Sequence, residues 1–348
     1  MPTQSARPTP FERLMATPRV SDRTPRKITD KAWWPWFKRG AAALFFAGVA
    51  ALLVSQALTI EWGQVLSSLK NYPLTAVWGA ALLALASFTL YSCFDLLGRR
   101  YTGHTLGAPT VMLVTFVSYA FNLNLGSMVG GIAFRFRLYS RLGLGNGVIT
   151  RIMSLSMLGN WMGYVLLSGL VFSLYPLTLP ADWSIDSAHL RFIGFALLAT
   201  AASYLGLCAF SRQRTLQVRG HSIDLPSLGL AALQLIMGAG NWLLMSGIVF
   251  VLLQHRIEFS AVVSVLLLAA VAGVITHIPA GLGVLEAVFV ALLSHRMPRH
   301  ELLAALVAYR LVYYLAPLGL ATLVYLVMEA KARQTAKTDA TNEKPNPF

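Results

Sequence analysis

Charged side chains are scarce in this sequence, and acidic ones are the scarcest. Only 12% of the 348 residues are charged, with 14 Asp and Glu against 28 Lys and Arg, while 56% are hydrophobic. This composition excludes an ordinary soluble domain and indicates a polytopic membrane protein. The net charge of +14 does not indicate a nucleic-acid-binding protein, because the basic residues lie in short segments between apolar blocks.

Cysteines and the common catalytic motifs are lacking too. Cys93 and Cys208 lie far apart in apolar segments, which argues against a disulfide framework, and no redox or zinc-binding pattern is present. The sequence has no phosphate-binding glycine-rich loop, no Gly-x-Ser-x-Gly, no His-Glu-x-x-His and no paired catalytic carboxylates. We therefore expect no metal, no cofactor and no self-contained hydrolase, although an enzyme with an unfamiliar membrane site stays open.

Long apolar segments occupy most of the chain between two polar ends. Residues 1–38 predict a disordered basic cytoplasmic tail, residues 39–330 a transmembrane domain, and residues 331–348 a disordered cytoplasmic C-terminal tail. Two apolar blocks, 108–134 and 260–293, are interrupted by Gly or Pro. Six further segments approach the ~20 residues that a membrane-spanning helix needs: 40–58, 74–97, 149–174, 190–210, 225–253 and 302–328.

The block 260–293 is too long to be one straight membrane helix. At ~1.5 Å per residue it would far exceed a ~30 Å hydrocarbon core. It contains the run 278–286, IPAGLGVLE, in which Pro279, Gly281 and Gly283 disfavour a continuous helix. We expect two short helices that meet at a break. The backbone groups released there must be satisfied by protein or by a water-filled cavity, so the break points to a site.

The distribution of basic residues predicts the topology. If both interrupted blocks are re-entrant and the N-terminus is cytoplasmic, 22 of the 28 Lys and Arg lie on the cytoplasmic side and five lie outside, with Arg310 inside a span. If only the first block crossed, the cluster Arg135, Arg137 and Arg141 would move outside and weaken this bias. We therefore predict an all-α polytopic membrane protein with about six crossing helices, two re-entrant helical hairpins entering from opposite faces, and both termini cytoplasmic.

A short internal similarity is compatible with an inverted repeat. Asn160-Trp161 and Asn241-Trp242 are each followed, within ten residues, by a Ser-Gly-x-Val-Phe segment. The first copy follows one interrupted block and the second precedes the other, as an inverted repeat requires. Chance similarity between apolar helices is the alternative explanation.

The first interrupted block combines glycines with side-chain amides. Gly126, Gly130 and Gly131 let the backbone turn, and Asn122 and Asn124 could hydrogen-bond to the groups that the turn releases. These residues predict a hairpin break in this block.

Arg135 and Arg137 follow that break closely. A helix that begins after Gly131 would direct its free amides toward the break, where an anion such as a lipid phosphate fits, and the two arginines could add charge. The alternative is that the arginines only extend to the cytoplasmic headgroups and fix the orientation of the protein.

Glu286 and Arg310 are isolated charges within apolar segments. Glu286 is the only acid of the second block, and Arg310 is the only basic residue well inside the last span. Because ionisable groups at such depth usually pair, we expect these two to contact each other. Three roles stay open for the pair: a structural pin, a site for a substrate headgroup, and a proton or ion relay. Tyr309 could line the same cavity or serve as an interfacial anchor.

Two other polar positions have structural explanations. Asp95 lies four residues before Arg99, which predicts a local helical ion pair of little energetic weight. Gly159 and Gly163 flank Asn160 and predict a close contact between helices, with an interhelical hydrogen bond from Asn160.

These motifs resemble those of the lysylphosphatidylglycerol synthase transmembrane-region family. The resemblance covers about residues 40–330 and rests on the order of the interrupted blocks, the run 278–286 followed by Ala308-Tyr309-Arg310-Leu311, and the segment 134–144. The sequence departs from the family's Pro-Gly-Gly-x-Gly-x-x-Glu element at Ala280. It also lacks the proline that relatives often place in the first break.

The resemblance implies a flippase-like domain with two re-entrant segments around a cavity, in which Arg135, Glu286 and Arg310 bind the headgroup or gate the path. Full-length synthases join such a domain to a soluble aminoacyltransferase that uses aminoacyl-tRNA. This sequence ends about twenty residues after its last span, so we expect no lysyltransferase activity.

Together these observations predict a non-enzymatic, multi-pass protein of the bacterial inner membrane that translocates or binds a phospholipid or related lipid, anionic or amino-modified, between the two hairpins. We expect no nucleic-acid partner and leave self-association open. The alternatives are a proton- or ion-coupled transporter of a small solute, with Glu286 as the proton carrier, and a membrane-embedded transferase that acts on a lipid carrier.

Overall fold

The computed structural model of the protein describes the greater part of the chain from residue 63 to residue 328. The predicted tails, the first predicted span (40–58), and Gly130, Pro279 and Ala280 lie outside the described residues. The residues that the structure describes are 63, 67–68, 70, 72–126, 131–175, 177, 187–211, 215–218, 221–276, 278 and 281–328.

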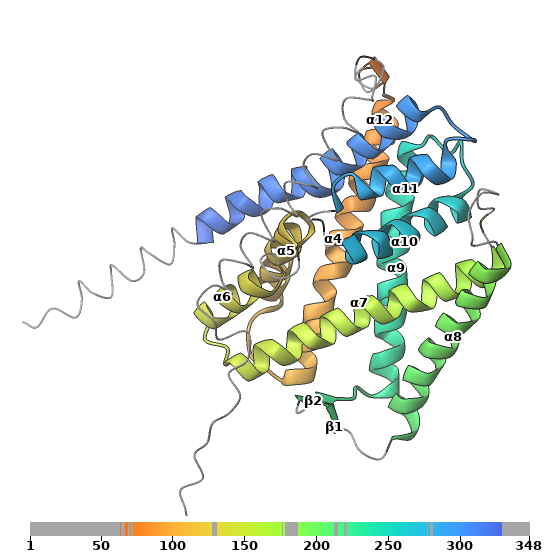
Figure 1. The fold of residues 1–348 in the computed structure, drawn as a ribbon. Coiled ribbons are helices and arrows are strands. Elements are labelled where there is room, and N and C mark those ends of the chain that lie inside the picture. Colours follow the sequence, from red (N-terminus) through yellow and green to blue (C-terminus); the bar gives the residue numbers. More distant parts are fainter. Residues whose placement is uncertain are drawn as a thin grey trace, which may run out of the picture. The chain divides into compact units, whose positions relative to one another are not determined.

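Helices form most of the described chain (Figure 1). One short antiparallel hairpin of β1 (Thr215–Val218) and β2 (His221–Asp224) separates two of them and was not predicted. The predicted all-α polytopic class is confirmed. The helices are α4 (Leu74–Thr102), α5 (Ala108–Leu125), α6 (Phe134–Arg141), α7 (Asn146–Leu174), α8 (Ser187–Phe210), α9 (Leu228–Leu252), α10 (Phe259–Thr276), α11 (Val284–Leu293) and α12 (Arg299–Tyr309), which continues through the π-helix η4 (Arg310–Leu315) as far as Met328.

Seven helices among the described residues are long and apolar enough to cross a membrane. Five of them, α4, α7, α8, α9 and the α12–η4 helix, correspond to predicted spans. The other two, α5 and α10, have 18 residues each, or about 27 Å, so by length either could also cross. The helices after the breaks, α6 and α11, have only 8 and 10 residues.

Each interrupted block is therefore a long helix followed by a short one, and α10 is longer than the short helix expected at the start of the second block. Within each block the two helices pack against each other, α5 on α6 and α10 on α11. This is the arrangement that a helical hairpin needs, and its re-entrant placement in the membrane stays a prediction.

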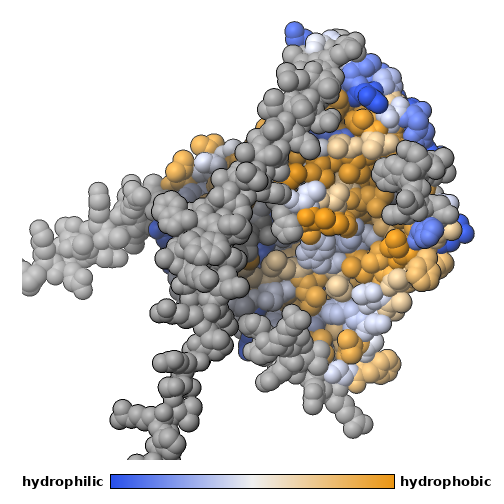
Figure 2. All heavy atoms as spheres, viewed as in Figure 1, coloured by the Kyte–Doolittle hydropathy of each residue, from blue (hydrophilic) through white to orange (hydrophobic). Residues whose placement is uncertain are grey.

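The core lies where α4, α7 and α9 meet. The helix α7 packs against α8 and α9, and α4 packs against α5, α7 and α9. Large side chains such as Phe94, Ile152 and Ile248 are almost fully buried there. The outward faces are apolar too, because Trp78, Phe192 and other large hydrophobic side chains are mostly exposed. Figure 2 shows hydrophobic side chains spread over the visible face, with hydrophilic ones near its upper edge. Such a surface suits contact with lipid.

Small residues allow α7 and α9 to approach each other closely. A Cβ atom added to Gly163 would lie 2.3 Å from the Cα of Gly238. Because helices in lipid gain little from the hydrophobic effect, close van der Waals packing of this kind holds them together. The predicted close contact is confirmed. The expected hydrogen bond from Asn160 is not made through its Oδ1 atom, which is buried without a partner in the described part of the chain.

Replacing Gly163 by alanine is expected to lower the free energy of unfolding by about 1–3 kcal/mol, because the new methyl group would collide with the backbone of α9. Gly206, in α8, is the matched control, because a Cβ there would meet no atom within 4 Å. Gly206→Ala should leave stability unchanged or raise it by up to about 1 kcal/mol. Thermal unfolding in one detergent, monitored by circular dichroism, would compare the two variants. Equal changes in stability for Gly163→Ala and Gly206→Ala would contradict the close packing of α7 on α9.

Candidate functional site

An ion pair joins the second interrupted block to the last long helix. The Nε atom of Arg310 donates to Oε1 of Glu286 at 2.5 Å, and Nη2 donates to Oε2 at 3.1 Å. The same Nη2 atom donates to the carbonyl oxygen of Gly281 at 2.9 Å. The arginine and glutamate side chains are only 13% and 20% exposed. The structure thus brings together the two charges that were expected to pair.

Local backbone geometry places both partners. Gly283, the N-cap of α11, has φ 77°, and Gly281 has φ 56°, a left-handed conformation that glycine adopts most easily. Glu286 lies in the first turn of α11, where a carboxylate is favourable beside the free amides. Arg310 begins η4, and π-helical segments often occur at functional sites. By binding the Gly281 carbonyl, Arg310 satisfies a backbone group beside the break.

A second ion pair, which the sequence did not predict, lies where the first interrupted block meets α4. Asp95 is completely buried, and its Oδ1 atom lies 3.6 Å from Nη1 of Arg135. The hydroxyls of Tyr139 and Ser156 donate to the same carboxylate at 2.8 and 2.5 Å. The prediction of a local pair between Asp95 and Arg99 is therefore wrong.

The buried face of α4 explains that correction. Tyr91, Asp95 and Gly98 follow one another at spacings of four and three residues and are all buried, so they share one face of the helix. That face packs against other helices, and Asp95 consequently meets Arg135 of α6. In the sequence, only the three- and four-residue spacing of Asp95 from its apolar neighbours could have indicated that it lies on a buried face of the helix.

Arg135 is only 4% exposed, so its side chain is packed inside the protein. Its Cζ atom lies 5.7 Å from the centroid of the Tyr91 ring, within the range of a cation–π interaction. This burial argues against the alternative that Arg135 only extends to the headgroups, whereas Arg137 and Arg141 are exposed and the alternative stays open for them. The Nε atom of Arg135 is buried and has no hydrogen-bond partner among the described residues.

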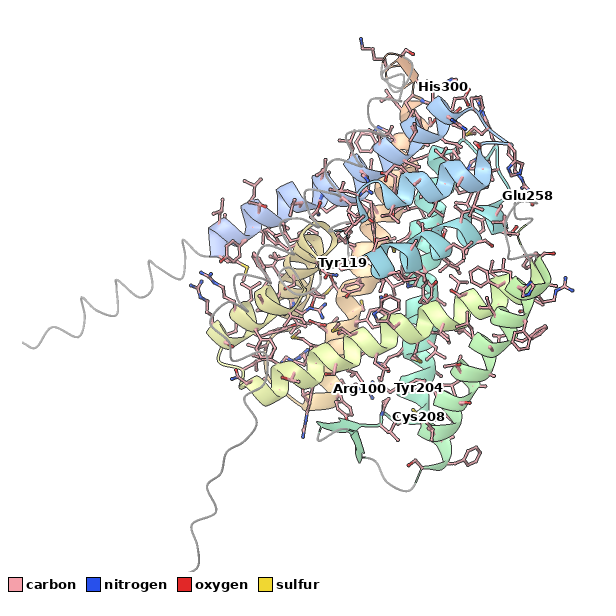
Figure 3. The ribbon with its side chains drawn as sticks, viewed as in Figure 1. Arg100, Tyr119, Tyr204, Cys208, Glu258 and His300 are labelled. Atoms are coloured by element: carbon pink, nitrogen blue, oxygen red, sulfur yellow. The ribbon has the colours of Figure 1, made fainter. Side chains whose placement is uncertain are left out.

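Buried tyrosines lead inward from Arg135. The ring of Tyr91 stacks on that of Tyr119 with centroids 3.5 Å apart. The hydroxyl of Tyr119, labelled amid the helices in Figure 3, lies 3.0 Å from the hydroxyl of Tyr313 in η4. Residues from α4, α5 and η4 therefore form one continuous contact chain.

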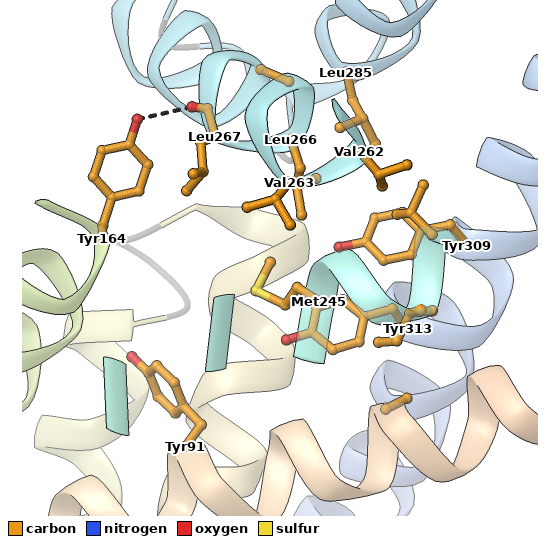
Figure 4. Close-up of a cluster of buried hydrophobic side chains, with 14 of the residues drawn as sticks. Tyr91, Tyr164, Met245, Val262, Val263, Leu266, Leu267, Leu285, Tyr309 and Tyr313 are labelled. Carbon is orange, nitrogen blue, oxygen red and sulfur yellow. Dashed lines mark hydrogen bonds between the residues drawn. The ribbon is translucent and has the colours of Figure 1, made fainter. Parts of the chain in front are cut away.

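The chain continues to Arg310. Tyr313 stacks on Tyr309 with ring centroids 5.5 Å apart, and both side chains are completely buried (Figure 4). The Tyr313 hydroxyl also lies 2.8 Å from that of Ser87, which donates to Oδ1 of Asn241 at 2.7 Å. The Tyr309 ring lies 5.7 Å from that of Tyr314, and the Cζ atom of Arg310 lies 5.3 Å from the centroid of the Tyr314 ring, so the aromatic chain connects the two ion pairs.

The amides of the first block contact both sides of its break. Asn124 donates through Nδ2 to the carbonyl oxygens of Ala120, at 2.8 Å, and Tyr314, at 3.2 Å, and so links α5 to η4. A Cβ atom at Gly131 would lie 2.8 Å from Oδ1 of Asn122, so a larger residue there would require the Asn122 side chain to shift. The helix α5 ends at Leu125 and is followed by its C-cap Gly126, which has φ 84°.

His104, in the loop between α4 and α5, lies near the charges of Asp95 and Arg99. Both ring nitrogens are buried without a hydrogen-bond partner in the part of the chain that the structure describes. Burial, and then the charge of Arg99, lower the pKa of His104, while Asp95 opposes this shift. The imidazole is therefore neutral at pH 7. Among the described residues, no group of three or more His, Cys, Asp or Glu is placed to hold a metal ion.

Known proteins resemble this chain over most of its length. The family model for the TM region of lysylphosphatidylglycerol synthase matches residues 41–321. The inner membrane protein YbhN of Escherichia coli (strain K12) is 44% identical over 309 residues, which are 88% of this chain and 97% of that protein. An uncharacterized protein of Synechocystis is 32% identical over 81% of this chain and 88% of its own length.

A longer protein matches as well. A phosphatidylglycerol lysyltransferase of Staphylococcus haemolyticus is 23% identical over 296 residues, which are 81% of this chain and 33% of that protein. The similarity to the transferase is thus confined to a third of its length.

Proposed function

Because the chain belongs to the family defined by the transmembrane region of lysylphosphatidylglycerol synthase, we propose that it binds a phospholipid or related lipid and carries the headgroup along a polar path between the two interrupted blocks. The protein is a multi-pass membrane protein. The name of its Escherichia coli relative supports a place in the bacterial inner membrane.

The observation that carries the proposal is the pair of arginine–carboxylate contacts, connected through buried tyrosines inside an apolar helix bundle. Ionisable groups at membrane depth are costly and usually mark a substrate or ion path. A guanidinium binds a phosphate with the same two-pronged geometry that it uses for a carboxylate. Arg310 and Arg135 could therefore exchange Glu286 and Asp95 for the phosphate of a headgroup, while the released carboxylates could bind an amine.

The same chemistry suggests the substrate class. An anionic phospholipid offers phosphate to the arginines, and an amino-modified one also offers ammonium to the carboxylates. The Staphylococcus haemolyticus relative is named as a phosphatidylglycerol lysyltransferase. We do not assign the transferase activity to this chain, because the match covers only a third of that protein.

The proton-coupled alternative has weaker support. The hydroxyls of Tyr119, Tyr313 and Ser87 form a hydrogen-bonded chain that a proton could follow. The steps that lead outward from it, Tyr119 to Tyr91 and Tyr313 to Tyr309, are ring stacking. Ring contacts pass no proton, so this chain alone does not connect the two carboxylates.

Reconstituted vesicles with a fluorescently labelled phospholipid test the proposal, using quenching by added dithionite to follow headgroup exposure. Glu286→Gln should slow exposure at least about tenfold, which corresponds to about 1.4 kcal/mol in the barrier. The control is Glu258→Gln, because Glu258 is 78% exposed and meets Arg296 only at 4.0 Å.

The protein has to remain folded in both variants, as judged by gel filtration and circular dichroism. The proposal fails if the unsubstituted protein moves lipid no faster than empty vesicles do. It also fails if Glu286→Gln leaves the rate of lipid movement unchanged. Solute uptake driven by a pH gradient without lipid movement would favour the transporter alternative.

A further inference from the structure

A separate cavity of about 310 Å³ lies beside the first turn of α12. Its walls come from the segment before α4, the end of α9 and the start of α12, and its polar lining includes Ser68, Tyr72, Gln254, Arg256 and Glu301. This volume is in the range of small-ligand sites. Arg310 lies nine residues beyond Glu301, or about 13 Å along the helix, so the cavity is distinct from the site described above.

The cavity is also far from Asp95. Tyr72 lies just before α4, whereas Asp95 lies 21 residues beyond the first residue of that helix, or about 32 Å along its axis. Figure 3 labels His300, the neighbour of Glu301, and Arg100 at opposite ends of the helices. The cavity is therefore at the end of the bundle opposite Arg100.

Two opposite charges meet at the cavity and remain accessible. Arg256 donates through Nη1 to Oε2 of Glu301, and the side chains are 52% and 32% exposed. Exposed ion pairs contribute little to stability. A ligand that carries both an anion and an ammonium can therefore replace each partner with a charge of the same sign at little loss.

The hydroxyl of Tyr72 supplies an unused donor at the same cavity. It is buried, and it has no hydrogen-bond partner in the described part of the chain. Burial raises the pKa of Tyr72, and the charge of Arg256 opposes this only in part, so the hydroxyl keeps its proton at pH 7. A ligand acid group held by Arg256 would give this hydroxyl an acceptor.

The backbone next to Arg256 has an unusual conformation. Gln254 and His255 have φ values of 54° and 60°, which residues other than glycine rarely adopt. The amide of His255 donates to the carbonyl of Phe250 at 3.2 Å, and the two side-chain rings lie 4.6 Å apart. Strained conformations of this kind are concentrated at ligand sites. Here the strained turn ends α9 and leads directly to Arg256.

We propose that this cavity binds a small zwitterion of the phosphoethanolamine type, with its acid group on Arg256 and Tyr72 and its ammonium on Glu301. The zwitterion could be the headgroup of a lipid or a free solute, which have this chemistry in common. Binding here does not require lipid movement, so the inference goes beyond the proposed function and can be tested without it.

Isothermal titration of the purified full-length protein in detergent with glycerophosphoethanolamine is the direct test. We expect saturable binding, at least about tenfold tighter than that of glycerol 3-phosphate, which lacks the amine. Glu301→Gln should weaken binding about tenfold, and so should Tyr72→Phe, which removes only a hydroxyl. Glu258→Gln, which changes a nearby exposed ion pair outside the cavity, should leave binding unchanged.

Nanodiscs distinguish the two sources of the zwitterion. If phosphatidylethanolamine in the disc competes with the soluble probe, the cavity takes a lipid headgroup; if discs with and without this lipid bind the probe equally, it takes a free solute. Either result supports the proposal. The absence of saturable binding, equal binding of glycerol 3-phosphate, or an unchanged affinity in Glu301→Gln would overturn it, whether or not the protein moves lipids.

Discussion

Replacing Asp95 by alanine is expected to lower the free energy of unfolding by about 3–5 kcal/mol, because the change leaves the guanidinium of Arg135 buried without its countercharge. Tyr139 and Ser156 would also lose the acceptor for their hydroxyl groups. Unfolding in mixed micelles, titrated with sodium dodecyl sulfate and followed by circular dichroism, would measure the difference.

The matched control is Arg99→Gln, because Arg99 is the partner that sequence spacing suggests for Asp95. Since the carboxylate contacts Arg135 instead, the control should change stability by less than about 0.5 kcal/mol. A double variant, Asp95→Leu with Arg135→Leu, should recover part of the loss, because removing both charges leaves none buried alone. Equal losses in Asp95→Ala and Arg99→Gln would show that the interior pair is not formed.

The fold class could be read from the sequence because apolar runs of about 20 residues have few alternatives to membrane helices. The positions of the helices were predicted well wherever polar residues flank an apolar run, as for α7 and α9. Gly or Pro marked both interruptions correctly. Lengths within the interrupted blocks could not be predicted, since a chain near such residues can continue its helix for several turns when neighbouring helices support it. The β1–β2 hairpin was missed because strands of four residues give little periodic signal.

The candidate site was only partly predictable for a related reason. Glu286 and Arg310 are single charges in long apolar segments, so the cost of leaving either one unpaired identifies the other as its partner. Asp95 has basic residues both nearby in the sequence and far away, and only the packing of α6 on the face of α4 and α7 selects Arg135. Contacts between Ser87, Tyr119, Asn241 and Tyr313 join four helical segments, and no local pattern encodes them.

Arg310→Ala is expected to lower the free energy of unfolding by about 3–5 kcal/mol, because Glu286 would keep a charge in a largely buried position with no arginine to balance it. The carbonyl of Gly281 would lose its donor as well, so the break before α11 would be destabilised directly.

Comparison with Glu286→Gln separates a structural pin from a headgroup site. Glutamine still offers an oxygen to Arg310, and Arg310 keeps its bond to Gly281, so this variant should lose only about 1–2 kcal/mol. If the same micelle titration shows that Arg310→Ala and Glu286→Gln lower the free energy of unfolding by amounts equal to within about 0.5 kcal/mol, a structural role for the Gly281 contact is contradicted.

Arg310→Lys keeps the charge but not the two-pronged geometry. Arg310→Lys could lose less than half as much stability as Arg310→Ala and still move labelled lipid at least about tenfold more slowly than the unsubstituted protein. In that case the guanidinium acts on the headgroup as well as on the fold.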